Sequence, residues 1–205
     1  MWSATLTNML MHPSLIDNAL IVVGEGFWVF SGTAQLRKLV RTSNAKGLSA
    51  PSQTLNAAGN VGWCTYFGLN HLWYPFITNI ILFFVTIVIL GYTLSNRKQF
   101  IRGLITIVIV GPLTSYALIR YTVESGWLAM AYNEIASMPQ LVKVVYRKRV
   151  SGISERGLFF ATGAMILTLT YAFLIHSRPL MTGCALGLIN VVVLFIYYYR
   201  HRHHG

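Results

Sequence analysis

The sequence predicts an all-α integral membrane protein with seven transmembrane helices, arranged 3+1+3 as two parallel triple-helix repeats joined by one extra helix. Three observations support this prediction. Of the 205 residues, 55% are hydrophobic and only 10% are charged, whereas an ordinary soluble domain has roughly 25% charged residues. Apolar segments recur along the chain at the length of a bilayer span, about 20 residues. One polar pattern also occurs twice, 105 positions apart.

Seven apolar segments define the expected helices. We expect the spans at residues 18–40, 53–71, 75–95, 101–121, 126–147, 157–176 and 179–199. Aromatic residues favour the membrane–water interface, and they stand at several span ends: Trp73 between spans two and three, Trp127 at the start of span five, and Tyr197 to Tyr199 at the end of span seven. The short connections between spans leave no room for a soluble catalytic domain.

The basic residues are distributed unevenly between the two ends of these spans. When the spans alternate in direction, every Lys and Arg except Arg120 and Arg178 falls on one side. Cytoplasmic loops carry an excess of Lys and Arg, so we expect the amino terminus outside and the tail, residues 200–205, in the cytoplasm. The plasma membrane is the favoured location. The net charge of +11 therefore reflects topology, and we expect no nucleic-acid partner, because that binding needs a basic surface on a folded soluble domain.

The repeated polar pattern follows the ends of the first and fifth spans. An offset of 105 superposes a glutamine, a lysine and a Gly-X-Ser segment on the same residues: Gln35 on Gln140, Lys38 on Lys143, and 47–49 on 152–154. Shared apolar composition does not explain these matches. We expect a first repeat at 18–95, a linker helix at 96–121 and a second repeat at 122–199. The linker helix makes the two repeats parallel, and transporters built this way bind their solutes at the repeat interface.

The pattern resembles the PQ-loop (MtN3) superfamily, which includes the SWEET and SemiSWEET sugar transporters. Its strongest element is Pro139–Gln140 near the end of span five, followed by a basic turn and Gly152–Ile153–Ser154. The first copy reads Ala34–Gln35, so one proline is missing. The resemblance implies a hinge at Pro139. A glutamine near a helix end can also bond carbonyls that a kink frees, so we expect Gln35, Pro139 and Gln140 to form a hinge or an inner gate.

A second resemblance is to the SemiSWEET sugar pocket, which pairs a Trp on the second helix of the unit with an Asn on the third. Trp63 and Asn79 stand on the corresponding spans with that spacing. An indole offers a flat apolar face and an amide offers a donor and an acceptor, which suit a sugar ring and its hydroxyls. The resemblance implies substrate binding by this pair and by Asn190, about two turns beyond the equivalent position in the second copy. That copy has Thr168 and Cys184 instead of the pair.

A structural interpretation of the same residues stays open, with Trp63 as an interface anchor and Asn79 in an interhelical hydrogen bond.

Two carboxylates also fall within the spans, where an ionised group costs at least about 3 kcal/mol. The repeat alignment puts Glu134 one helical turn from the level of Glu25, so both can line one cavity and couple transport to protons or cations. The alternative is a protonated carboxyl bonded between helices. His71 and His176 occupy equivalent outer span ends, as solvated interface residues or as a pH-sensitive gate.

The favoured function is small-solute transport by alternating access, and within it SWEET-like sugar facilitation. Proton-coupled transport of amino acids or other small metabolites is the alternative that the two carboxylates favour. A non-transporting receptor or scaffold of the same fold is the second alternative. No nucleophile–base pairing or metal-ligand spacing indicates an enzyme, so we expect no catalytic residue, cofactor or metal. The expected partners are the solute, with a sugar favoured, and the lipid bilayer, and homo-oligomer formation is left open.

Overall fold

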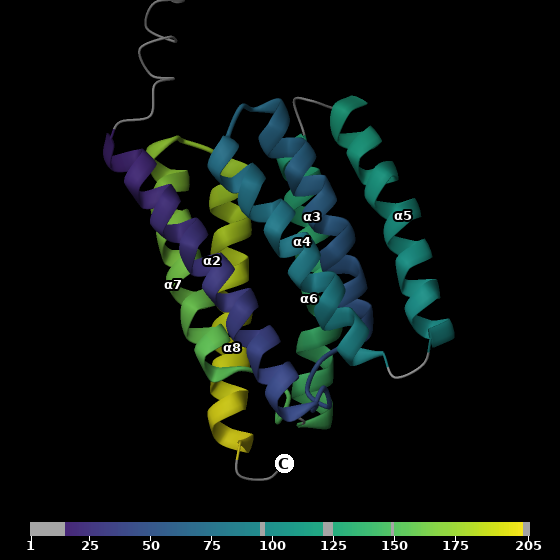
Figure 1. Ribbon diagram of the computed structural model, residues 1–205. Coiled ribbons are helices and arrows are strands. Elements are labelled where there is room, and N and C mark those ends of the chain that lie inside the picture. The colour runs from purple at the N-terminus through teal and green to yellow at the C-terminus, as the bar shows by residue number, and fades with distance from the viewer. Residues whose placement is uncertain (1–14, 95–96, 121–124, 149, 203–205) are drawn as a thin grey trace, which may run out of the picture.

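The computed structural model describes residues 15–94, 97–120, 125–148 and 150–202. This part of the chain contains seven α-helices and no strand (Figure 1). The helices are α2 (Leu15–Thr42), α3 (Ala50–Leu69), α4 (Trp73–Thr93), α5 (Arg97–Arg120), α6 (Ser125–Arg147), α7 (Glu155–Leu174) and α8 (Arg178–His201). Each predicted span coincides with one helix to within a few residues, which confirms the all-α prediction. The first and last residues of the expected linker, 96 and 121, and residues 203–205 of the expected tail lie outside the described residues.

Matching serine caps start two of the helices. Ser49 precedes α3 and accepts a hydrogen bond from the backbone N–H of Ser52, and Ser154 precedes α7 and accepts one from Gly157. A serine at this position satisfies an N–H group that the first helical turn leaves without a partner, which is worth about 1 kcal/mol. The second serine stands 105 positions after the first, so equivalent signals start α3 and α7.

Left-handed residues end four of the helices. Ser43 and Lys148 follow α2 and α6 with φ of 47° and 52°, and His71 and His176 follow α3 and α7 with φ of 56° and 53°. A residue in this conformation ends a helix by turning the chain back on its last carbonyls. Both histidines are exposed. Their position is therefore explained by the turn that they form, and a gating role for them stays a prediction.

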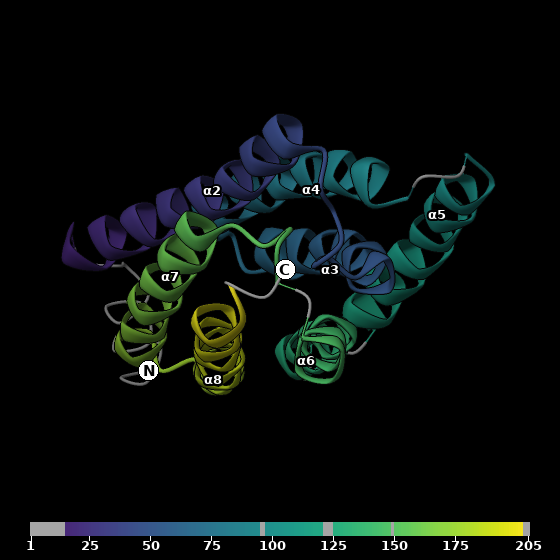
Figure 2. The same ribbon diagram turned by 90° about the horizontal axis from the view of Figure 1, so that it is seen from below.

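Five helices, α2, α4, α5, α7 and α8, are long and apolar enough to cross a membrane. The other two, α3 and α6, are as long but more polar, because each carries several polar residues, among them the cavity-lining amides Asn60 and Asn133. Seen along the bundle in Figure 2, α3 lies inside, flanked by α4, α5 and α6. A helix covered by its neighbours has less surface to expose to lipid and tolerates more polar residues. The chain is an integral membrane protein that crosses the bilayer several times.

The packing follows a regular scheme. α4 packs against both α2 and α3, and α8 packs against both α6 and α7. α2 also packs against α7, and α3 against α6. α5 stands at the outer edge of the bundle, against α3 and α6 (Figures 1 and 2).

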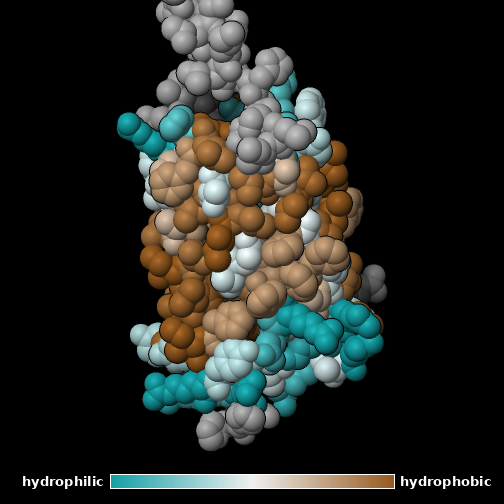
Figure 3. All heavy atoms as spheres, turned by 90° about the vertical axis from the view of Figure 1, so that its left-hand side faces the viewer, coloured by the Kyte–Doolittle hydropathy of each residue, from teal (hydrophilic) through white to brown (hydrophobic). Residues whose placement is uncertain are grey.

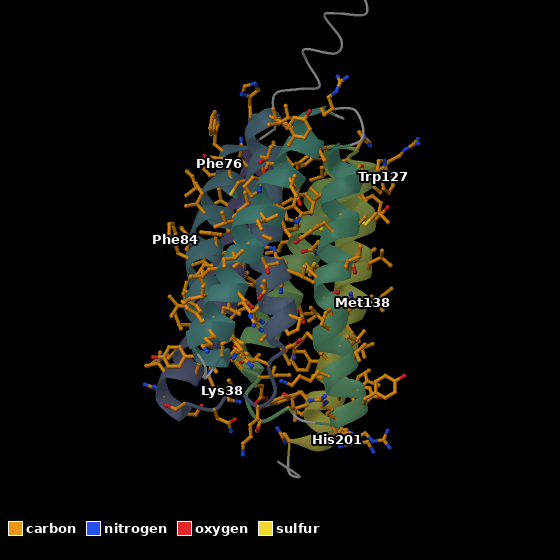
Figure 4. The ribbon with its side chains drawn as sticks, turned by 90° about the vertical axis from the view of Figure 1, so that its right-hand side faces the viewer. Lys38, Phe76, Phe84, Trp127, Met138 and His201 are labelled. Carbon is orange, nitrogen blue, oxygen red and sulfur yellow. The ribbon has the colours of Figure 1, made fainter. Side chains whose placement is uncertain are left out.

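The surface separates into an apolar belt and two hydrophilic ends. Figure 3 shows the belt on the face of α2 and α7, with a broad hydrophilic rim at the lower end. Lys38 and His201 lie at that end, whereas Phe76 and Trp127 lie toward the other (Figure 4). We call the end that holds Lys38, His201 and the two connections, at 43–49 and at 150–154, the basic end. The opposite end, which holds the connections at His71 and His176, is called the distal end.

Candidate functional site

A cavity of about 140 Å³ lies in the interior of the bundle. Every described helix except α5 contributes to its wall: Glu25 and Trp28 of α2, Asn60, Trp63 and Phe67 of α3, Asn79 and Leu82 of α4, Asn133 of α6, Met165 and Thr168 of α7, and Leu180, Gly183 and Cys184 of α8. A mostly apolar wall with a few polar groups is typical of a small-molecule site. The cavity is therefore the candidate binding site.

Trp63 and Asn79 both line this cavity, from the neighbouring helices α3 and α4. The Trp63 ring stacks on Phe67, with centroids 5.2 Å apart and planes inclined by 20°. The Asn79 side chain is buried and donates from Nδ2 to the carbonyl of Pro75 in its own helix at 2.8 Å. These contacts hold both side chains in place. The Asn79 carbonyl oxygen has no hydrogen-bond partner within the described chain and can accept a bond from a ligand.

The cavity wall repeats with the offset found in the sequence. Four pairs of lining residues stand 105 positions apart: Trp28 with Asn133, Asn60 with Met165, Trp63 with Thr168, and Asn79 with Cys184. The positions of the predicted Trp–Asn pair and their counterparts thus line one cavity. Within each pair the side chains differ, so the two sides of the wall present different chemistry.

Glu25 reaches the cavity from α2 and is 6% exposed. Its side chain is hydrogen-bonded to Thr78 of α4. The preceding residue, Gly24, lets α2 approach α7 closely, because a Cβ there would stand 3.3 Å from the Cβ of Leu167. No Lys, Arg or His is among the described residues that line the cavity. The carboxyl group therefore has polar contact but no cationic partner in the wall.

Glu134 and Asn190 pair with each other away from the cavity wall. Asn190 Nδ2 donates to Glu134 Oε2 at 2.8 Å and to the Ser137 hydroxyl at 3.1 Å. The other carboxyl oxygen of Glu134 is buried and has no partner in the part of the chain that the structure describes. Neither residue is among those that line the cavity, so the structure does not bring Asn190 to the Trp63 pair or Glu134 to the wall with Glu25. Asn190 lies six residues after the lining residue Cys184, and Glu134 lies one residue after the lining residue Asn133. Because an α-helix has 3.6 residues per turn, neither residue shares the helix face of its lining neighbour.

Gln35 and Gln140 form reciprocal hydrogen bonds at the basic end. Gln35 donates from Nε2 to the carbonyl of Gly152 and accepts at Oε1 from the N–H of Ser154, each at 2.8 Å. Gln140 makes the same two bonds, at 2.8 and 2.7 Å, with the carbonyl of Gly47 and the N–H of Ser49. Each glutamine thus binds the connection that follows the helix of the other. We call these four bonds the clasp.

Further equivalent contacts surround the clasp. Lys38 Nζ donates to the carbonyl of Ile153 at 2.5 Å, and Lys143 Nζ donates to the carbonyl of Leu48. Beneath them lies a buried cluster that includes Leu39, Leu48, Val144 and Ile153. The two connections also cross closely at Gly152, where an added Cβ would stand 2.8 Å from the carbonyl oxygen of Asn44. The two connections are therefore in direct contact at the basic end.

Pro139 stands inside α6, immediately before the clasp glutamine of that helix. Proline has no N–H and removes one helical hydrogen bond, yet α6 continues through it from Ser125 to Arg147. The equivalent residue of α2 is Ala34, whose backbone carries the N–H. A hinge at this level would therefore be confined to α6.

The sequence analysis did not single out Trp28, Asn60 and Asn133, which add one indole and two amides to the wall. Two signals could have identified them. Asn60 stands three residues before Trp63, a spacing that places both on one helix face. Trp28 and Asn133 are related by the offset of 105, which makes them a matched pair of polar or aromatic residues within apolar spans.

The acids, histidines and cysteines of the described chain do not gather into a ligand set. No three of these side chains come close enough together to hold a metal ion in the described ranges. Cys64 and Cys184 are free thiols. The cavity therefore offers amide, hydroxyl, carboxyl and aromatic groups to an organic solute.

Comparison with known proteins shows a similarity in fold without a match in sequence. No family model matches the chain, and no curated protein matches its sequence. Among solved structures, it is similar to a eukaryotic SWEET transporter determined at 3.7 Å resolution, with a TM-score of 0.67 and 12% sequence identity. The match covers 91% of this chain and 97% of that one. The protein is a multi-pass integral membrane protein with the fold of a eukaryotic SWEET transporter.

Proposed function

We propose that the protein is a SWEET-like transporter that moves a small solute through its central cavity by alternating access. The observation that carries the proposal is the cavity, which is lined by four pairs of positions 105 apart in a chain with the SWEET fold. Transporters with internal repeats hold their solutes at the repeat interface and expose that site to one side of the membrane at a time. The mechanism needs no covalent chemistry and no cofactor.

The packing scheme supports two parallel repeats in a 3+1+3 order. Exchanging α2, α3 and α4 for α6, α7 and α8 leaves the set of contacts unchanged: α2–α4 becomes α6–α8, α3–α4 becomes α7–α8, and α2–α7 becomes α6–α3. α5 lies outside this scheme, as expected for a linker. A two-fold axis along the membrane normal would produce this exchange.

The cavity favours one sugar ring as the solute. Its volume of about 140 Å³ is close to the roughly 150 Å³ of an engineered cavity that holds benzene. A monosaccharide therefore fits far better than a disaccharide. Trp63 supplies a flat apolar face, and Asn60 and Asn79 supply amides for hydroxyl groups.

The clasp supports an assignment of the basic end as an inner gate or pivot. It links the helices and connections that two rocking repeats would have to separate at that end. By the positive-inside rule this end faces the cytoplasm. Alternating access then requires the clasp either to open or to act as the point about which the repeats turn.

Proton-coupled transport of a small metabolite is the second candidate. It is favoured by Glu25 in the cavity wall and by Glu134, one carboxyl oxygen of which has no hydrogen-bond partner among the described residues. Carboxyl groups inside a membrane commonly relay protons in transporters. This candidate predicts transport that responds to a proton gradient, whereas facilitation does not.

The test is counterflow in proteoliposomes containing the purified protein. We expect labelled monosaccharides to accumulate against an internal pool of the same sugar without any ion gradient, and a disaccharide to give no signal. Amino-acid counterflow that requires a proton gradient, with no sugar counterflow, would replace the proposal with the second candidate. Specific sugar binding with no flux would instead indicate a receptor or scaffold.

A further inference from the structure

We propose that the solute is an amino sugar, whose protonated amine is held by Glu25 while its ring and hydroxyls contact the remaining wall. This inference rests on the proposed sugar transport and narrows its substrate class. It starts from the one ionisable oxygen group in the described wall, which neutral sugar binding does not require.

The Glu25 carboxyl group has no cationic partner among the described residues of the cavity wall. It is 94% buried at the cavity, with Thr78 as its hydrogen-bond partner. No basic side chain is among the described lining residues. An ionised carboxylate inside a membrane is expensive unless it is paired. A solute that brings an ammonium group provides that pair.

Aromatic rings beside Glu25 favour the same charge. Trp28 follows it by three residues on α2, which places both on one helix face. Trp63 and Phe67 contribute two more rings to the wall from α3. The negative faces of aromatic rings attract cations, and the attraction strengthens when the cation is removed from water. The wall thus combines a carboxylate with aromatic faces, an arrangement that suits an alkylammonium group.

The other polar groups of the wall suit hydroxyls. The Thr168 hydroxyl is buried on a residue that is 6% exposed, and it has no hydrogen-bond partner in the described chain. This oxygen is covered by the protein and lies near Gly24 at the contact of α2 with α7, so a solute would reach it only if these helices moved. Asn60 and Asn79 can accept from or donate to further hydroxyls.

The same wall disfavours a free amino acid. An α-amino acid carries a carboxylate beside its amine, and that carboxylate needs a basic or cationic partner when it leaves water. The described wall offers none, and it already contains the Glu25 carboxyl group. The position equivalent to Glu25 in the second repeat is Met130, so only the first repeat contributes a carboxyl group at this position. The matching solute has one cationic group and an otherwise neutral polar body.

The experiment measures uptake into proteoliposomes at the same neutral pH on both sides, with labelled glucosamine, glucose and N-acetylglucosamine as probes. We expect the wild-type protein to prefer glucosamine over both neutral sugars by about 10- to 100-fold in apparent affinity, from the strength of hydrogen bonds to charged groups. In Glu25→Gln, which keeps the shape and a hydrogen-bonding amide, the ratio of glucosamine to glucose uptake should fall by a similar factor. The control Glu155→Gln removes an acid outside the cavity and should leave the ratio unchanged.

Each outcome decides between the two proposals. Glucose uptake equal to glucosamine uptake in the wild-type protein overturns the amino-sugar inference and leaves sugar transport intact. Absence of uptake for every sugar overturns the proposed function itself. A second uptake series with an imposed pH gradient tests proton coupling: if uptake of all sugars depends on the gradient, and Glu25→Gln abolishes that dependence without changing the ratio of the sugars, Glu25 is assigned to proton coupling instead. If Glu25→Gln does not fold, the wild-type preference decides alone, supported by Glu25→Asp, which should keep it in part.

Discussion

Trp63 and Asn79 are held by contacts within the first three helices, while their counterparts 105 positions later, Thr168 and Cys184, offer neither a ring nor an amide. All four residues line the same cavity. A solute that depends on stacking and on amide hydrogen bonds therefore obtains both mainly from one side. Substitutions on the two sides should have unequal effects.

We expect Trp63→Ala and Asn79→Ala each to weaken apparent solute affinity about fivefold to a hundredfold, because losing a buried partner costs roughly 1–3 kcal/mol and about 1.4 kcal/mol is a tenfold change. The measurement is concentration-dependent counterflow in proteoliposomes. Cys184→Ala should have a much smaller effect. Trp73→Ala is the matched control for removing an indole, since Trp73 is 57% exposed and does not line the cavity. Normal affinity in both cavity variants would exclude the Trp–Asn pair from binding.

Of the residues predicted to bind solute or to couple transport, Trp63, Asn79 and Glu25 line the cavity, whereas Asn190 and Glu134 do not, and their roles stay predictions. Trp63, Asn79 and Glu25 could be found because a known pattern or a charge within an apolar span marks them. Asn190 and Glu134 were harder to place, because position along a helix does not reveal which face the residue occupies. Their mutual hydrogen bond satisfies a carboxyl oxygen within the α6–α8 contact, and such pairing is visible only in three dimensions.

At the level of helices and connections, the clasp joins parts of the chain that lie far apart in sequence. Each clasp glutamine satisfies one backbone carbonyl and one backbone N–H of the opposite connection. Removing one of these glutamine side chains therefore breaks two hydrogen bonds and leaves a backbone carbonyl and a backbone N–H without partners. The cost should exceed that of removing an ordinary surface amide.

We expect Gln140→Ala to lower the free energy of unfolding by about 1–3 kcal/mol, seen as a fall of roughly 2–10 °C in the melting temperature of the detergent-solubilised protein. Gln35→Ala should behave alike. Gln53→Ala is the control, because Gln53 lies on α3 nearby and its side chain makes no hydrogen bond in the described chain. Equal melting temperatures for Gln140→Ala and Gln53→Ala would show that the clasp contributes little.

Gly152→Ala should disturb the same end through shape alone. A Cβ there would stand 2.8 Å from the carbonyl oxygen of Asn44 and 3.0 Å from the backbone nitrogen of Gly47, and backbone atoms cannot move aside as a flexible side chain can. We expect a destabilisation of about 1–3 kcal/mol, the usual range for overpacking. Gly26→Ala on α2 is the control, since nothing lies within 4 Å of its added Cβ. If the two variants melt alike, the close crossing of the connections has no energetic role.

The helices themselves were predictable because span length and apolar runs are strong signals. The positions of α3 and α6 were predicted, although these two helices are not among the five that are apolar enough by composition alone to cross a membrane. What the sequence did not reveal is how the connections meet. Gln35 and Gln140 could be matched by offset, but a reciprocal exchange between them, in which each binds the loop of the other copy, depends on the packing of α2 with α7 and of α3 with α6.

For the whole molecule, we predict that the basic end faces the cytoplasm and that the distal end faces the outside. Lys46 and Asn70 are exposed residues near the two ends. With Cys64 and Cys184 replaced by alanine, Asn70→Cys should react with a membrane-impermeant maleimide added to intact cells. Lys46→Cys should react only after permeabilisation, because the positive-inside rule places it in the cytoplasm. Labelling in the reverse order would invert the proposed orientation.

The unequal wall of the cavity has a consequence for the handedness of the cargo. A cavity with two identical sides would accept a molecule equally well in two poses related by a half-turn. In the second repeat the positions equivalent to Trp63, Asn79 and Glu25 hold Thr168, Cys184 and Met130, so we expect the two poses to differ in energy and one to be preferred. Three unlike contacts, one ring, one amide and one carboxyl group, are enough to distinguish a molecule from its mirror image. The protein should therefore carry one enantiomer of its cargo in preference to the other.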